Sequence, residues 1–93
     1  MKLWKFYWDC RRMGSVTGLF FATKKAVDEA IGSEVYFGEI LGKHSEIYGT
    51  LDMEDLTEIK LQNAAAEALV DAIGETVSGY NPLNYIQEEL EDV

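Results

Sequence analysis

Residues 3–9 read Leu3-Trp4-Lys5-Phe6-Tyr7-Trp8-Asp9, and every second side chain from Trp4 onward is a large aromatic. Alternation with a period of two, in residues that favour strands, predicts a half-buried β-strand with these aromatics on one face. Residues 10–15 predict a loop, and residues 16–22 a second strand. A symmetrical hairpin places Tyr7 opposite Gly18, so that the ring covers the space the glycine leaves.

A short helix is expected next in the chain. Thr23 can accept a hydrogen bond from a first-turn amide and so cap a helix over residues 24–31. Gly32 can adopt the left-handed conformation that commonly ends a helix.

A second hairpin is expected from residues 34–41 and 46–52, joined by a loop over residues 42–45. The apolar face, expected to point inward, carries Tyr36, Gly38, Ile40, Ile47, Gly49 and Leu51. The other face mixes acids with aromatics and carries Val35, Phe37, Glu39, Leu41, Glu46, Tyr48, Thr50 and Asp52. Two opposed glycines on the inward face predict a bulky cover, from Trp4 or Trp8.

Residues 56–61 alternate weakly and predict a fifth strand. A second helix is expected over residues 64–73, between a cap at Asn63 and a stop at Gly74. Its spacing predicts a core-facing stripe made of Ala66, Leu69, Val70 and Ile73.

The last element is expected to start at Asn81-Pro82, a good cap followed by proline in the first turn. Residues 86–93 are strongly acidic, and negative charge at the negative pole of a helix predicts a frayed tail. At 93 residues the chain is short for more than one core. We therefore expect residues 1–93 to form a single α+β domain. It would have an antiparallel sheet of about five strands, two helices packed on it and a short C-terminal helix.

Charge is divided unevenly along the chain. Residues 1–25 hold six basic side chains and one acid, whereas residues 26–93 hold two basic side chains and sixteen acids. The formal net charge of −9 disfavours direct binding to nucleic acid, which needs clustered cations, and to an anionic membrane. It favours encounter with a basic protein partner.

Catalytic chemistry has few candidates. Cys10 is the only cysteine, so no intramolecular disulfide is possible, and a cytoplasmic location is expected. No signal-peptide run or membrane-length apolar stretch is present. Arg11 and Arg12 would stabilise a Cys10 thiolate, but His44, the only histidine, lies on the other loop, and no third residue is placed to orient it. We expect no catalytic residues, no cofactor and no enzyme activity.

Acidic side chains can bind metal ions or form a protein-binding surface. Asp52, Glu54, Asp55 and Glu58 lack the alternate spacing and central glycine of a calcium loop, so no metal site is expected. Carboxylates interleaved with aromatics suit an interface with a basic protein. The candidate binding residues are Glu34, Phe37, Glu39, Glu46, Tyr48, Asp52, Glu54, Asp55 and Glu58.

Two alternatives remain open. Arg11, Arg12 and Lys43 would bind phosphate, with a tyrosine stacking on a base, in a protein that sequesters cyclic nucleotides. Exposed strand edges would instead pair two copies in a homodimer or a larger structural oligomer.

Residues 8–14 and 36–49 resemble segments of uncharacterised phage and prophage proteins. Small size, acidity and the lack of a catalytic set also resemble the inhibitors that phages direct against host defences, including anti-CRISPR proteins and nucleic-acid mimics. The resemblance implies a non-enzymatic inhibitor in the host cytoplasm. Its acidic face would block a basic, nucleic-acid-binding surface of a larger host protein or effector complex.

Overall fold

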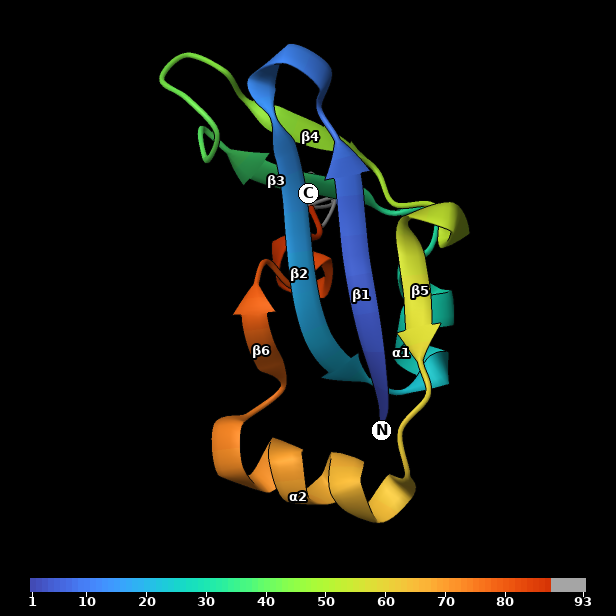
Figure 1. Ribbon diagram of the computed structural model, residues 1–93. Coiled ribbons are helices and arrows are strands. Elements are labelled where there is room, and N and C mark those ends of the chain that lie inside the picture. Colours follow the sequence, from blue (N-terminus) through green and yellow to red (C-terminus); the bar gives the residue numbers. More distant parts are fainter. Residues whose placement is uncertain (88–93) are drawn as a thin grey trace, which may run out of the picture.

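The N-terminal hairpin forms the centre of the fold. In the computed structural model, which describes residues 1–87, β1 (Lys2–Asp9) pairs antiparallel with β2 (Ser15–Ala22). A turn of 3-10 helix, η1 (Arg11–Met13), joins the two strands. The expected hairpin is confirmed (Figure 1).

The aromatic face of β1 points into the core as its alternation predicts. Trp4 and Phe6 are fully buried, and Trp8 is half-buried. The indole Nε1 of Trp4 donates to the carbonyl oxygen of Ala22 at 3.1 Å, so burial leaves no unpaired donor on that ring.

The register of the hairpin differs by one residue from the symmetrical expectation. Phe6, not Tyr7, lies opposite Gly18, and Tyr7 lies opposite Thr17. A Cβ atom at Gly18 would overlap the backbone carbonyl of Tyr80. The glycine is therefore needed for close approach of a backbone segment, and the prediction that Tyr7 lies opposite Gly18 and covers it is wrong.

In the described part of the chain, the main sheet has four antiparallel strands in the order β5-β1-β2-β6. Strand β5 (Leu56–Ile59) pairs with β1, and β6 (Thr76–Gly79) pairs with β2. The strand β6 was not expected, because its four exposed residues show no apolar alternation. The expectation of one sheet of about five strands is corrected to a four-stranded sheet and a separate two-stranded one.

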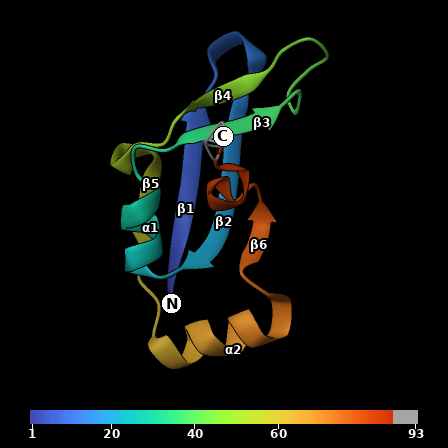
Figure 2. The ribbon, with the colours of Figure 1, turned by 180° about the vertical axis from the view of Figure 1, so that it is seen from behind.

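A second layer covers one face of the main sheet. It consists of α1 (Lys24–Ala30), the hairpin of β3 (Glu34–Gly38) and β4 (Ile47–Thr50), and η3 (Pro82–Tyr85). Figure 2 shows these elements in front of β1 and β2, whereas Figure 1 shows the opposite face of the sheet uncovered. The core lies between the two layers. Because the strands in residues 1–87 are antiparallel and two helices accompany them, the architecture is α+β.

Helix α1 has the ends that its sequence predicts. The Thr23 hydroxyl accepts a hydrogen bond from the Ala26 amide at 3.0 Å, and Gly32 has a φ of +88° after the last turn. Val27 and Ala30 are buried against the sheet.

In the second hairpin the faces of β4 are as expected, but those of β3 are reversed. Tyr36 lies opposite Tyr48. This register differs from the expected one by an odd number of residues, so the two faces of β3 are exchanged. Val35 and Phe37 are buried, and Tyr36 is exposed. Wholly apolar side chains enter the core at lower cost than a phenol, which carries a hydroxyl. The prediction that Phe37 lies on the outer, acidic face is wrong.

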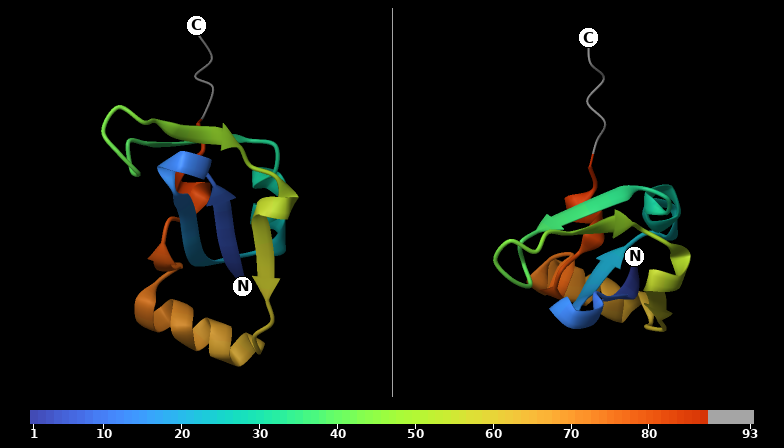
Figure 3. Two further views of the ribbon diagram at one scale, coloured as in Figure 1. Left: turned by 45° about the horizontal axis from the view of Figure 1, so that its top comes forward. Right: turned by 90° about the horizontal axis from the view of Figure 1, so that it is seen from above.

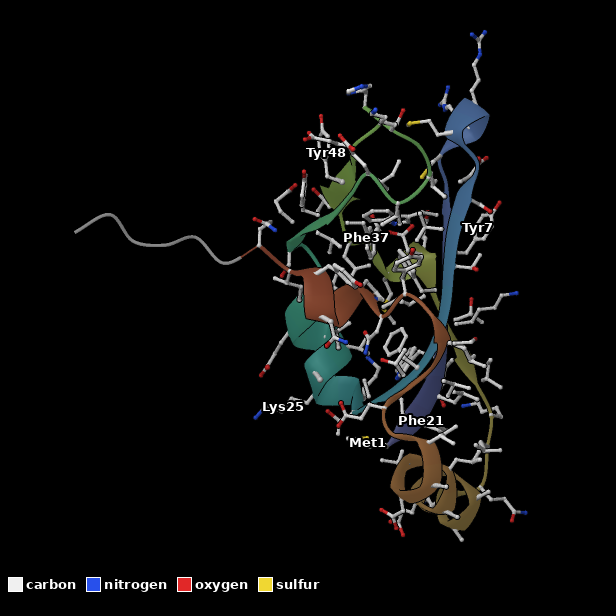
Figure 4. The ribbon with its side chains drawn as sticks, turned by 90° about the vertical axis from the view of Figure 1, so that its left-hand side faces the viewer. Met1, Tyr7, Phe21, Lys25, Phe37 and Tyr48 are labelled. Carbon is white, nitrogen blue, oxygen red and sulfur yellow. The ribbon has the colours of Figure 1, made fainter. Side chains whose placement is uncertain are left out.

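Phe37 is instead the centre of an aromatic cluster. Its ring lies 5.5 Å from that of Trp8 and 4.8 Å from that of Tyr85, measured between centroids. Figure 4 shows Phe37 between the hairpin and the main sheet, and Tyr7 on the opposite side of that sheet. The Trp8 contact is edge-to-face and the Tyr85 contact is tilted, and together such contacts fix how the hairpin sits on the sheet.

Helix α2 (Asn63–Ile73) connects the two edge strands of the main sheet and lies below its lower end (Figure 1). Gly74, with a φ of +82°, follows its last residue, as expected. The expected core stripe is only partly correct: Ala66 is buried, but Leu69 is 40% and Ile73 51% exposed. The second layer does not extend over this end of the molecule.

Near its C-terminus, the chain returns to the hairpin of β3 and β4. The Asn81 side chain accepts a hydrogen bond from the Leu83 amide at 3.0 Å, and the turn that follows is 3-10 rather than α-helical. Ile86 bridges to Val35 in β3. The remaining part of the expected tail, residues 88–93, lies outside the described residues. Within residues 1–87, no helix has the length and apolar character needed to cross a membrane.

Candidate protein-binding groove

An open groove of about 500 Å³ runs along β4, which we call the β4 groove. One wall is the end of β1 with the turn that follows it, the other is β4, and η2 (Met53–Asp55) closes one end. Figure 3 shows β4 passing close to the upper end of β1. The groove is lined by Trp8, Asp9, Cys10, Arg11, Met13, Glu46, Ile47, Tyr48, Gly49, Thr50, Asp52, Glu54 and Asp55.

The groove is strongly anionic. Among residues 1–87, five of the side chains that line it are carboxylic acids, and Arg11 is the only basic one. The ion pairs among residues 1–87 join Lys2 and Lys60 to Glu58, and Lys24 to Asp28, so none of them includes a groove carboxylate. Because the low-dielectric wall of a cleft focuses the field of its charges, this arrangement attracts cations.

The acids at the closed end are held by a capping box. The Asp52 carboxylate accepts from the Glu54 amide at 3.1 Å, and the Asp55 carboxylate accepts from the Asp52 amide at 2.9 Å. These hydrogen bonds use one oxygen of each carboxylate and leave the other available. The Glu54 side chain is exposed between them.

At the opposite end, Glu46 is oriented by a tyrosine. The Tyr36 hydroxyl donates to a Glu46 carboxylate oxygen at 3.0 Å. This hydrogen bond, assisted by desolvation and by the charges of Glu46 and Glu39, raises the pKa of Tyr36 above its ordinary value. Tyr48, the cross-strand neighbour of Tyr36, is 66% exposed and is the most accessible aromatic of the groove.

Trp8 forms the floor beneath Gly49. A Cβ atom at residue 49 would lie 3.4 Å from Cη2 of the indole. The expectation that a tryptophan covers this glycine is therefore supported for Trp8, although Gly49 is opposite Val35 and not Gly38. The indole of Trp8 thus places an apolar surface between the acids of η2 and Glu46.

The structure brings together about half of the binding residues expected from sequence. Glu46, Tyr48, Asp52, Glu54 and Asp55 all line the groove. Glu34, Phe37, Glu39 and Glu58 do not. Trp8 and Asp9 were missed, because no local pattern indicates that the end of β1 meets β4.

The acids outside the groove have other surroundings. Glu34 accepts a hydrogen bond from the Thr50 hydroxyl on the outer face of the hairpin. Glu58 accepts hydrogen bonds from Lys2 at 3.2 Å and from Lys60 at 3.3 Å, which lower the pKa of its carboxyl group. Glu58 is therefore locally neutralised and belongs to a different surface.

The basic residues of the nucleotide-binding alternative are not gathered in this groove. Arg11 lines it, whereas Arg12 and Lys43 do not. Phosphate next to Arg11 would also meet the repulsion of the surrounding carboxylates.

The thiol of Cys10 is not activated. Burial, followed by the charge of Asp9, raises the pKa of Cys10 above its ordinary value. The neighbouring arginines therefore do not stabilise a thiolate, contrary to the effect considered from sequence. His44 is exposed on the hairpin loop and does not line the groove. Among residues 1–87, no group of three or more His, Cys, Asp or Glu is arranged to hold a metal ion.

No protein-family model matches the chain, and neither the curated proteins nor the solved structures contain a match.

Proposed function

We propose that this protein is a non-enzymatic binding protein whose β4 groove docks on a basic, nucleic-acid-binding surface of a larger protein. The observation that carries the proposal is the gathering of five carboxylates around an exposed tyrosine in one groove. Docking there would exclude nucleic acid from the partner.

The charges and the aromatics have separate roles in this proposal. The carboxylates accelerate encounter and orient the partner, and this attraction is screened over about 8 Å at physiological ionic strength. Tyr48 supplies a partly apolar anchor of the kind that dominates binding energy at protein interfaces. Binding is therefore expected to weaken as salt increases, without being abolished.

The partner class follows from the resemblance of residues 8–14 and 36–49 to phage and prophage proteins. We propose that the partner is a defence complex in the cytoplasm of a bacterial host, and that this protein inhibits the complex. An effector that binds nucleic acid presents the basic surface that the groove requires.

The experiment is affinity capture from host lysate with three forms of the protein. The groove variant carries Glu46→Lys with Glu54→Lys, and the control carries Glu29→Lys with Glu75→Lys on exposed sites outside the groove. Both variants change the net charge equally. We expect a partner that is retained by the wild type and the control, lost by the groove variant and released by added nucleic acid.

Retention of the same proteins by the groove variant and the control contradicts the proposal, because only the total charge would then matter. Binding that does not change with salt contradicts it as well.

A homo-oligomer is the second candidate, and one observation favours it. Leu69 and Ile73 form an exposed apolar stripe on α2. Light scattering at micromolar concentration tests it: Leu69→Lys with Ile73→Lys should convert an oligomer to monomers. A wild-type protein that is already monomeric contradicts this candidate.

A further inference from the structure

Strand β4 has a free edge that opens into the groove. It is half of a two-stranded sheet and pairs only with β3 among residues 1–87. The far edge of β3 is already occupied, since the Gln87 amide donates to the Glu34 carbonyl oxygen at 2.8 Å. The hairpin therefore has one covered edge and one open edge.

The backbone groups on the open edge can be assigned from those that are paired. Leu51 uses both of its backbone groups toward β3: its amide donates to Ser33 at 2.9 Å, and its carbonyl accepts from Gly32 at 2.8 Å. Because the pairing direction alternates along an antiparallel strand, the amides and carbonyls of Tyr48 and Thr50 point away from β3. Both residues line the groove.

We propose that this edge takes an extended, basic segment of the partner, which adds to the hairpin as a strand beside β4. This inference rests on the proposed function and specifies how the groove is filled. The chain from Glu46 to Asp52 spans about 20 Å when extended, which matches a segment of about six residues.

The side chains around the edge specify the segment. On one face of an added strand, alternate side chains would lie beside Glu46 and Tyr48, where lysine or arginine is favoured. On the other face they would meet the indole of Trp8 and the carboxylate of Asp9 across the groove. A segment with a basic residue at every second position and apolar residues between them matches the Glu46 side with its charges and the Trp8 indole with its apolar face.

The same charges argue against a second copy of this chain as the occupant. Open edges are usually protected by lysine, proline or a bulge, and Ile47–Thr50 contains no lysine or proline. Two β4 edges placed together would bring two sets of groove carboxylates into contact, and like charges across a strand pair are destabilising. The carboxylates thus exclude the chain itself and admit a basic segment.

The first test uses a fluorescein-labelled hexapeptide of alternating lysine and valine, with fluorescence anisotropy at low salt. Two isomers of equal charge carry N-methyl groups either on the lysine amides or on the valine amides. Because only one set of amides faces β4, we expect one isomer to bind about tenfold more weakly than the parent peptide. The other should bind within about twofold of the parent, since its methyl groups face away from the strand.

The second test changes the protein. Thr50→Pro removes an amide from the open edge, where proline is tolerated in a strand, and Thr50→Ala is the matched control that keeps the amide. We expect the parent peptide to bind Thr50→Pro about tenfold more weakly than Thr50→Ala. In the wild type, peptide should slow hydrogen exchange at the amides of Tyr48 and Thr50, a readout that needs no substitution.

Failure of this inference differs from failure of the proposed function. If both methylated isomers bind alike, or the amides of Tyr48 and Thr50 exchange unchanged, strand addition is overturned. Failure of the parent peptide to bind at low salt overturns it as well. The docking of a basic surface is decided separately, by the Glu46→Lys/Glu54→Lys variant and its control.

Discussion

The indole of Trp8 lies directly beneath Gly49, with a space between them that admits one methyl group and no more. A Cβ atom at residue 49 would be 3.4 Å from the ring, at the short end of ordinary contact. Gly49→Ala should change the free energy of unfolding by less than about 1 kcal/mol, whereas Gly49→Leu must displace the indole and should cost about 1–3 kcal/mol. Urea unfolding followed by tryptophan fluorescence compares the two. Equal stability of both variants would show that Trp8 does not form the floor.

Gly18 is needed for a different reason, the close approach of the Tyr80 backbone. Gly18→Ala should destabilise the protein by about 2–4 kcal/mol, because a backbone carbonyl cannot move aside as a flexible side chain can. Gly42→Ala is the control, since its Cβ would meet only the Ser45 hydroxyl at 3.9 Å. Thermal unfolding should separate the two variants. A mild effect of Gly18→Ala would mean that β6 and Tyr80 do not pack on β2 as described.

Tyr36 should titrate above its ordinary range because it donates a hydrogen bond to Glu46. The raised pKa means that folding favours the neutral phenol. Its contribution to stability is complete below the unfolded pKa of about 10 and is lost as the pH rises through the folded pKa. Glu46→Gln should lower the pKa of Tyr36, measured by tyrosinate absorbance, and Glu34→Gln should not. Equal titration curves in both variants would contradict the orienting role of Tyr36 at the groove.

The exposed stripe of α2 should contribute little to stability. Leu69→Ala and Ile73→Ala should each lower the free energy of unfolding by less than about 1 kcal/mol in the monomer, since both side chains already contact water. Val27→Ala in α1, where the side chain is fully buried, should cost about 2 kcal/mol. Chemical denaturation measures all three. A cost at Ile73 as large as that at Val27 would mean that this face is covered in solution.

Much of the local structure follows from local signals. The hydroxyl of Thr23 caps α1, and Gly32 and Gly74 take positive φ values after the two helices. These features depend on the residue itself and its nearest neighbours, so the sequence is sufficient to predict them. The candidate site was predictable where its residues share one face of β4 or one turn, as for Glu46 with Tyr48 and for Asp52 to Asp55.

The register of the second hairpin could not be predicted in the same way. Its sequence permits either face of β3 to point inward, and the choice depends on contacts of Phe37 with Trp8, Tyr80 and Tyr85, which are distant in the chain. A shift by an odd number of residues exchanges every side chain between core and surface. Tyr36, and not Phe37, therefore accompanies Tyr48 on the outer face.

The amino-acid sequence by itself determined the central hairpin, the Thr23 cap of α1, the glycine after each helix and the acidity of residues 26–93, because periodicity, capping and charge are properties of short segments. The expected Asn63 cap is wrong, since Gln62 precedes α2 and no side chain caps it. Tertiary structure alone decided that Asp9 joins Glu46 and Asp52 around one groove, that β6 completes the main sheet and that the outer edge of β4 stays open. These three features depend on which distant segments bury their apolar surfaces against one another. Only the packing of the whole chain determines those contacts.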